Sequence, residues 1–247
     1  MDAAPLQSVQ HWLAAAAINA ALIAAASRVP LLTPAGWAHA AALGTVLWGC
    51  MGPAGWLAVV AYLALGSLVT RLGFAAKAAR GLAEARGGRR GPENVWGSAA
   101  TGALLALLMP LVNEAQHAVL LVGFAASFAA KLADTFGSEI GKRWGKHTVL
   151  ITSLRPVAPG SEGAISLEGT AASLMGGLLM AVICAGLGLL HGPTITLVTV
   201  VALLATLLES VIGATLQQRC AWLSNELVNA LQTALAALLA MAAAVVL

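Results

Sequence analysis

Charged residues are scarce in this sequence, and their scarcity argues against a soluble fold. Only 9% of the 247 residues are Asp, Glu, Lys or Arg, while 60% are hydrophobic and the mean hydropathy is +0.87. A soluble domain carries about 25% charged residues. The net charge of +3 is too small to indicate a nucleic-acid partner. Long Ala- and Leu-rich runs without alternation predict an all-α, polytopic membrane helical bundle.

Cysteine is also sparse. Cys50, Cys184 and Cys220 are scattered and form no CxxC pair, so a disulfide framework and a zinc site are both excluded. The N-terminus lacks a basic region of the kind that precedes a cleavable signal, so we expect the first apolar run to remain as a membrane span.

The apolar runs predict about eight spans in a single membrane domain, residues 1–247. A span needs about 20 apolar residues. The second run is short, which leaves a re-entrant or tilted segment, and seven spans, as the alternative. The expected spans are 7–26, 35–50, 53–72, 94–113, 115–140, 167–190, 193–216 and 225–247.

The basic residues segregate on one side of this arrangement. Twelve of the thirteen Lys and Arg residues fall there, and the remaining one, Lys131, lies within a span. The positive-inside rule therefore places both termini outside and the long loops 73–93 and 141–166 in the cytoplasm.

Carboxylates and a lysine lie near the end of the fifth expected span. Lys131 and Asp134 are three residues apart and share a helix face. Ser138 follows Asp134 by one turn, and Glu139 is next to it. Charges inside a span are costly and mark function, and Mg²⁺ prefers one or two carboxylates plus substrate phosphates. The alternative is an ion pair that only fixes helix packing.

Three further segments favour phosphate binding. A Gly/Ser-rich segment leads into the sixth span, where backbone amides and a helix N-terminus can approach a phosphate. Its alternative role is an N-cap at Ser166. The second segment is the basic loop 71–97, together with the basic run at 142–146; these residues can equally serve topology and lipid contact. The third is the polar cluster at 209–229, whose alternative role is to join helices. The candidate binding residues are Arg71, Lys77, Arg89, Arg90, Asn94, Ser98, Ser138, Lys142, Arg143, Gly160, Ser161, Gly163, Ser166, Gly169, Thr170, Ser173, Asn225 and Asn229, with Glu209 as a further metal ligand.

An internal parallel repeat is a further interpretation. Val95–Gly102 and Glu168–Leu174 open two spans at an offset of 72, and Asp134 and Glu209 close two spans at an offset of 75. Such a repeat would bring the two carboxylates to equivalent positions around one site. Chance similarity between Ala- and Gly-rich helices is the alternative.

Several motifs resemble the integral-membrane phytyl-phosphate kinase family of plastids and cyanobacteria. They cover roughly residues 66–240 and leave 1–65 as N-terminal helices. Glu209 departs from the pattern, because Asp is expected there. The motifs are RGGRRG at 86–91, ADTFGSEIG at 133–141, PGSEGAISLEGTAAS at 159–173, ESVIGATLQ at 209–217 and NELVN at 225–229.

The resemblance implies transfer of a phosphoryl group from CTP to phytyl phosphate, with Mg²⁺, to give phytyl diphosphate for tocopherol or phylloquinone synthesis. Asp134, Glu139 and Lys131 would be catalytic, and Asp134, Glu139 and Glu209 would bind the metal. The active site would face the cytoplasm in an inner, thylakoid or plastid membrane. A membrane cytidylyltransferase acting on a lipid phosphate and a secondary transporter are the alternatives.

Overall fold

The computed structural model describes residues 9–217 and 219–246, and most of them are helical. The expected spans 7–26 and 225–247 each extend slightly beyond the described residues. The helices are α1 (Val9–Ala26), α2 (Pro34–Arg71), α3 (Phe74–Ala78), α4 (Pro92–Leu108), α5 (Glu114–Trp144), α6 (Leu167–Gly186), α7 (Thr194–Ile212) and α8 (Asn225–Ala244). The short elements are η1 (Ala85–Gly88), η2 (Met109–Leu111), the π-helix η3 (Gly213–Gln217), and the antiparallel strands β1 (Val149–Leu150) and β2 (Ala164–Ile165).

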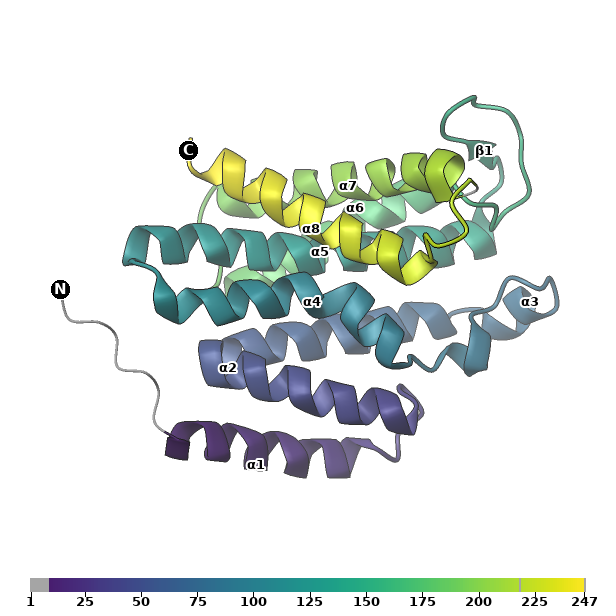
Figure 1. The fold of residues 1–247 in the computed structure, drawn as a ribbon. Coiled ribbons are helices and arrows are strands. Elements are labelled where there is room, and N and C mark those ends of the chain that lie inside the picture. Colours follow the sequence, from purple (N-terminus) through teal and green to yellow (C-terminus); the bar gives the residue numbers. More distant parts are fainter. Residues whose placement is uncertain (1–8, 218, 247) are drawn as a thin grey trace.

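Within the described residues, seven helices are long and apolar enough to cross a membrane, and α2 is folded in two. At Gly52 the backbone has φ 65° and ψ −158°, and Pro53 follows. Glycine tolerates this positive φ. A straight helix of 38 residues would be about 57 Å long, yet Arg71 at its end donates to the carbonyl of Pro30, just before its start, at 2.5 Å. Both spans expected at 35–50 and 53–72 are therefore present, antiparallel and side by side (Figure 1).

α5 lies in the centre of the bundle and packs against α2, α4, α6, α7 and α8 (Figure 1). Phe124, Phe128 and Leu132 on α5 are fully buried. α6 approaches closely because Gly137 has no side chain, and a Cβ there would meet the Gly169 carbonyl oxygen at 3.2 Å. Small residues of this kind allow membrane helices to pack with little space between their backbones.

Capping residues set where several helices begin. Asn113 and Gln116 form a reciprocal capping box at the start of α5. Ser166 accepts from the Gly169 amide at 3.1 Å and caps α6, and Ser224 caps α8 in the same way. Each side chain satisfies a backbone donor that has no partner within the helix.

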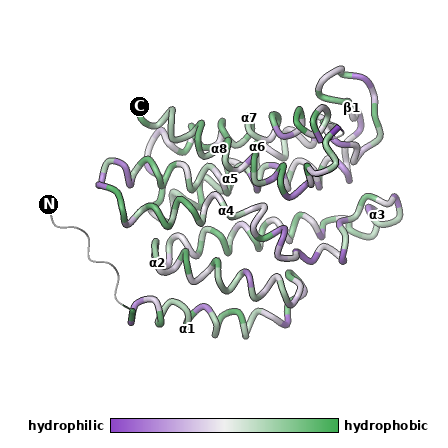
Figure 2. The backbone as a smooth tube through the Cα atoms, in the orientation of Figure 1, coloured by the Kyte–Doolittle hydropathy of each residue, from purple (hydrophilic) through white to green (hydrophobic). Residues whose placement is uncertain are grey.

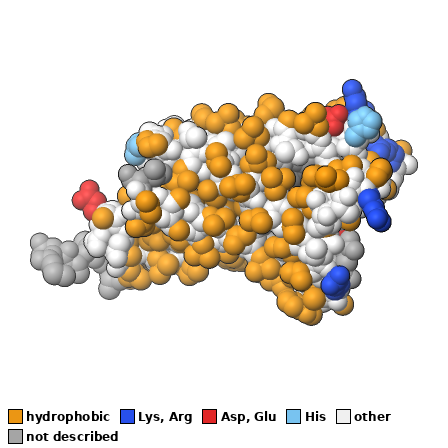
Figure 3. Space-filling view, turned by 90° about the horizontal axis from the view of Figure 1, so that it is seen from above, with side chains coloured by type: hydrophobic (Ala, Val, Ile, Leu, Met, Phe, Trp, Pro, Cys, Tyr) orange, Lys and Arg blue, Asp and Glu red, His pale blue; other side chains and the backbone are white. Residues whose placement is uncertain are grey.

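The surface is divided by polarity. Hydrophobic side chains cover the middle of the face drawn in Figure 3, and the Lys and Arg side chains gather at one end of it. Hydrophilic backbone segments gather at the same end, where the loops containing α3 and β1 lie (Figure 2). We call this the loop end. α1 begins and α8 ends at the opposite end of the bundle (Figure 1).

One loop boundary needs correction. The loop expected at 141–166 starts only after Trp144, so Lys142 and Arg143 belong to the last turn of α5. Helix C-termini carry partial negative charge, which favours cations in that turn. The charges at 139–143 are therefore held on a rigid element.

Candidate functional site

A cavity of about 420 Å³ lies at the loop end, enclosed by α2, α4, α5, α6, α7, α8 and the two long loops. It brings together segments that are far apart in sequence. Nineteen of the twenty-two residues expected at the site line it, namely Arg89, Arg90, Asn94, Ser98, Lys131, Asp134, Ser138, Glu139, Lys142, Gly160, Ser161, Gly163, Ser166, Gly169, Thr170, Ser173, Glu209, Asn225 and Asn229.

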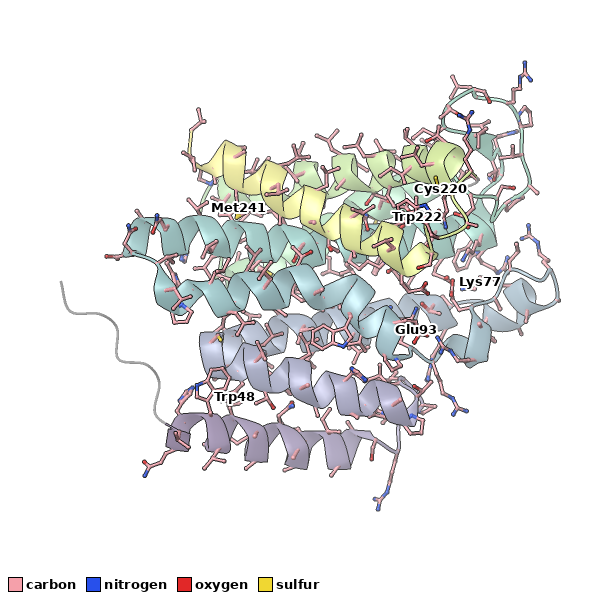
Figure 4. The ribbon with its side chains drawn as sticks, in the orientation of Figure 1. Trp48, Lys77, Glu93, Cys220, Trp222 and Met241 are labelled. Carbon is pink, nitrogen blue, oxygen red and sulfur yellow. The ribbon has the colours of Figure 1, made fainter. Side chains whose placement is uncertain are left out.

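The other three expected residues lie outside the cavity lining. Arg71 donates to the Pro30 carbonyl and fixes the end of α2. The guanidinium of Arg143 lies 5.0 Å from the centre of the Trp144 ring, in cation–π contact. Lys77 of α3 is buried against the end of α5, where it pairs with Glu139 (Figure 4). All three side chains therefore contact other parts of the protein and do not line the cavity.

Lys131 is held inside the cavity by two helices. Its ammonium group forms an ion pair with Asp134 on the same face of α5 and donates to Asn229 Oδ1 of α8 at 2.9 Å. Only 8% of the Lys131 side chain and 16% of the Asp134 side chain are exposed. The lysine therefore presents a fixed positive charge at the cavity wall, and its carboxylate partner keeps part of its surface open.

Glu139 joins α5 to the first long loop. It forms a buried ion pair with Lys77, and Lys142 Nζ lies 3.6 Å from its other oxygen. Lys142 also pairs with Glu84 of the loop at 2.9 Å. Burial acts to raise the pKa of Glu84, but the charge and hydrogen bond of Lys142, with smaller contributions from Glu139 and Lys131, together outweigh burial and hold that pKa below its ordinary value. Glu84 was not expected at the site, because no motif marks it.

Glu162 enters the cavity from the second long loop. Burial raises the pKa of this carboxyl group, Lys142 opposes the change, and the negative charge of Asp134 adds to it. Glu209 on α7 interacts electrostatically with both Asp134 and Glu162. Asp134 and Glu209 thus share one cavity, as the repeat predicted. Glu162 was not among the expected site residues. It lies in the motif at 159–173, and its charge within that Gly/Ser-rich segment could have identified it.

The loop that carries Glu162 is seated on α7 by Gly163. This residue has φ +74°, and a Cβ there would meet Ala214 Cβ at 2.4 Å and the Ser210 carbonyl oxygen at 2.6 Å. Glycine alone combines this backbone conformation with such a close approach. The loop position therefore depends on the glycine.

Arg90 reaches the cavity from the end of the first long loop. It donates to the Tyr62 hydroxyl at 2.5 Å, and its guanidinium lies 5.1 Å from the centre of the same ring. Asn94 accepts from Arg86 at 2.8 Å and donates to Glu226 of α8 at 3.3 Å. Tyr62 was not expected, because a tyrosine within an apolar span is ordinarily a packing residue.

The carboxylates fit Mg²⁺ better than a metal that needs a complete protein ligand set. Among residues 9–217 and 219–246, no three His, Cys, Asp or Glu side chains are close enough to hold a metal by themselves. Mg²⁺ takes one or two carboxylates and completes its shell with water and substrate phosphates. Asp134 and Glu209 can supply those carboxylates, whereas Glu139 already has two lysine partners.

Comparisons with known proteins match nearly the whole chain. The family model for the integral membrane protein DUF92 matches residues 17–237. An uncharacterized membrane protein of Synechocystis sp. is 50% identical over 93% of this chain and 90% of its own length. The chloroplastic protein VTE6 of Arabidopsis thaliana is 38% identical over 93% of this chain and 71% of its own length. An uncharacterized membrane protein of Methanocaldococcus jannaschii is 31% identical over 71% of this chain and 70% of its own length.

No solved structure matches the chain. The chloroplastic and cyanobacterial relatives confirm the family resemblance that the motifs indicated.

Proposed function

This chain belongs to the integral membrane protein family DUF92, and from that membership and the polar cavity we propose that it is a membrane kinase that transfers a phosphoryl group from CTP to phytyl phosphate. The observation that carries the proposal is a cavity that opens at one end of a membrane bundle and combines lysines, arginines and carboxylates. Cations suit phosphate groups, and carboxylates suit the metal that accompanies a nucleotide.

The reaction needs no general base from the protein. A phosphate monoester has a second pKa of about 6, so phytyl phosphate already carries an unprotonated oxygen at neutral pH. That oxygen attacks the γ-phosphorus of CTP and forms a new P–O bond. The bond between the γ-phosphorus and the β-phosphate oxygen breaks, CDP leaves with the electron pair, and phytyl diphosphate remains. The protein contributes positioning and charge stabilisation.

Three cations of the cavity have separate tasks in this proposal. Arg90 binds the acceptor phosphate next to Tyr62. Lys131, fixed by Asp134 and Asn229, faces the transferred group. Lys142, held by Glu84 and Glu139, binds the nucleotide phosphates beside the Gly/Ser-rich loop. Glu139 then acts mainly by orienting Lys142.

Mg²⁺, when bound, would neutralise negative charge on the nucleotide phosphates. Asp134 and Glu209 would hold it, because they share the cavity and neither has two cationic partners. Their mutual repulsion with Glu162 adds a physical reason for a cation there. We place this end of the bundle in the cytoplasm, in an inner or thylakoid membrane, because it carries the basic loops.

Product analysis of the purified protein tests the proposal. With CTP, Mg²⁺ and phytyl phosphate, we expect phytyl diphosphate and CDP. Asp134→Asn should abolish turnover and lower nucleotide affinity mainly in its Mg²⁺-dependent part. Glu114→Gln is the matched control, because Glu114 lies in the first turn of the same helix, outside the cavity lining.

Two other results would redirect the assignment. Release of pyrophosphate with transfer of CMP would make the protein a cytidylyltransferase. Absence of turnover with every prenyl phosphate and nucleotide would refute the enzyme, and substrate flux across vesicles would be the next assay. The position of the polar cavity at the loop end favours the enzyme over the transporter, since alternating access needs polar access from both sides.

A further inference from the structure

A second cavity, of about 260 Å³, lies between α1, both segments of α2 and α4. Its walls are almost entirely apolar and include Ile23, Trp37, Leu63 and Ala99. From sequence, the first two spans indicated only membrane anchoring or a wall for lipid access. In the structure they form one side of this cavity.

The apolar cavity and the polar cavity share part of their lining. Tyr62, Arg90, Asn94 and Ser98 line both cavities. A molecule with one polar end and one apolar end can therefore occupy both at once. Its polar end would lie among the cations of the loop end, and its apolar end would lie between α1 and α2.

The outer edge of the apolar cavity faces the membrane. Leu22 on α1 and Val60 on α2 line the cavity, and these residues are 41% and 36% exposed. In a bundle surrounded by lipid, exposure at this depth means contact with acyl chains. A hydrophobic chain can thus enter sideways from the bilayer, and the part that exceeds the cavity can remain in lipid.

Arg90 provides the charge at the junction. No carboxylate within the described residues lies at ion-pair distance from its guanidinium. Its Nη2 occupies the space beside Gly66, where a Cβ would meet it at 2.5 Å. A cation that is fixed between an apolar and a polar cavity, and that lacks an anionic partner, suits a phosphate attached to a hydrocarbon chain.

We propose that the apolar cavity holds the isoprenoid tail of a prenyl monophosphate, whose phosphate binds Arg90 at the junction. The assignment rests on the proposed function, and it extends it by giving α1 and the first segment of α2 the task of tail binding. A single chain bearing one phosphate fits the one cation at the junction. A nucleotide does not fit, because its base and ribose would leave polar groups without partners in the apolar walls.

Photolabelling in vesicles tests the assignment without requiring turnover. The probe is a phytyl phosphate analogue with a diazirine on the chain, and the labelled residues are mapped by mass spectrometry. We expect labels on α1, α2 and α4 residues of this cavity, and we expect unlabelled phytyl phosphate to compete. Labels confined to other helices, or labels that phospholipid displaces and phytyl phosphate does not, would overturn the assignment.

A matched pair of variants gives an independent kinetic readout. Ala40 lines the cavity, whereas Ala38 lies two residues away on the same segment, exposed and outside the lining. Ala40→Leu should raise KM for phytyl phosphate by about tenfold or more, as expected for a misfit of methylene size in an apolar pocket. KM for CTP and for a five-carbon prenyl phosphate should stay unchanged, and Ala38→Leu should match the unaltered protein. An equal KM for phytyl phosphate in the two variants contradicts the assignment.

The two proposals fail in different ways. Transfer from CTP to phytyl phosphate, with labels outside this cavity, would keep the kinase and reject the tail site. Competed labelling inside the cavity, without any phosphoryl transfer, would keep the tail site and reject the kinase.

Discussion

Lys77 and Glu139 form an ion pair across 62 residues of sequence, and both side chains are buried, at 0% and 2% exposure. Lys77 belongs to the short helix α3, and Glu139 lies one turn before the end of α5. The Lys77 ammonium also donates to the Thr70 carbonyl at 2.9 Å. The pair thereby attaches the first long loop to the central helix, on the side of the cavity where Lys142 lies.

Removing one member of this ion pair should lower the stability of the folded protein. Lys77→Met leaves Glu139 buried with only Lys142 nearby, so we expect a loss toward the lower end of the about 3–5 kcal/mol seen when one partner of a buried pair is removed. Thermal unfolding in detergent measures it. Lys146→Met, at an exposed position of the neighbouring loop, should change stability by less than about 0.5 kcal/mol.

A second substitution distinguishes a stability loss caused by an unpaired buried charge from one caused by poorer packing. In Lys77→Met combined with Glu139→Leu, no uncompensated carboxylate remains, so part of the lost stability should return. If the double variant is less stable than Lys77→Met alone, the cost lies in packing and the buried charge is not its cause.

The contrast between this pair and the bundle shows what the sequence could predict. The spans could be predicted because a bilayer requires long apolar runs. The point at which α2 folds back on itself, Gly52–Pro53, also lies between two predicted spans. Asp134 and Glu209 are rare charges in apolar helices, so the sequence predicted that they lie at one site, and both line the cavity. Most of the expected site residues do line one cavity, although their roles stay predictions.

Other features leave no local trace in the sequence. Lys77 occurs in a basic loop that predicted phosphate binding or lipid contact, and only the three-dimensional fold gives it a buried partner. Tyr62 and Glu84 belong to no motif. The apolar cavity is lined by the residue types that every membrane span contains, so its shape depends on how α1, α2 and α4 are packed.

Acid should weaken the attachment of the first long loop through Glu84. Its pKa in the folded protein lies below the ordinary 4.5, because burial is outweighed by the charge and hydrogen bond of Lys142 together with Glu139 and Lys131. The stabilisation is therefore present above pH 4.5 and is lost as the pH falls through the lower, folded-state pKa. The Glu84 side chain is 49% exposed, so solvent screens the pair and the effect stays under about 1 kcal/mol.

Comparison with Glu84→Gln isolates this contribution. At neutral pH the variant should unfold at slightly lower temperature than the unaltered protein, and the two should converge as the pH falls below 4.5. A difference in stability that stays constant from neutral to acid pH would show that the pair with Lys142 is not its source.

The second long loop should detach from α7 when Gly163 is replaced. Gly163→Ala adds a Cβ in a left-handed conformation, which costs about 1–2 kcal/mol, and it also forces that Cβ against Ala214 and the Ser210 carbonyl. Gly81→Ala is the matched control, because Gly81 has φ +68° with nothing within 4 Å of its Cβ position. Limited proteolysis should cut the 145–166 loop faster in Gly163→Ala only. Equal cutting in both variants would attribute the effect to backbone strain alone.

The Arg90 side chain should move when Gly66 is replaced, and the movement should change KM for the acceptor, phytyl phosphate. Gly66→Ala places a Cβ 2.5 Å from the present position of Arg90 Nη2, which is the far end of a flexible side chain, so the guanidinium can shift without unfolding the protein. Its bond to Tyr62 and its position between the two cavities are then lost. We expect KM for phytyl phosphate to rise, KM for CTP to stay unchanged, and thermal stability to fall only slightly.

Gly186→Ala is the control for this change, because Gly186 is helical and its Cβ position has nothing within 4 Å. Arg90→Lys provides the complementary test. Lysine keeps the charge but cannot contact Tyr62 and a phosphate with a planar, forked group. It should therefore also raise KM for phytyl phosphate. If both Gly66→Ala and Arg90→Lys leave KM for phytyl phosphate unchanged while turnover persists, the acceptor phosphate does not bind at Arg90.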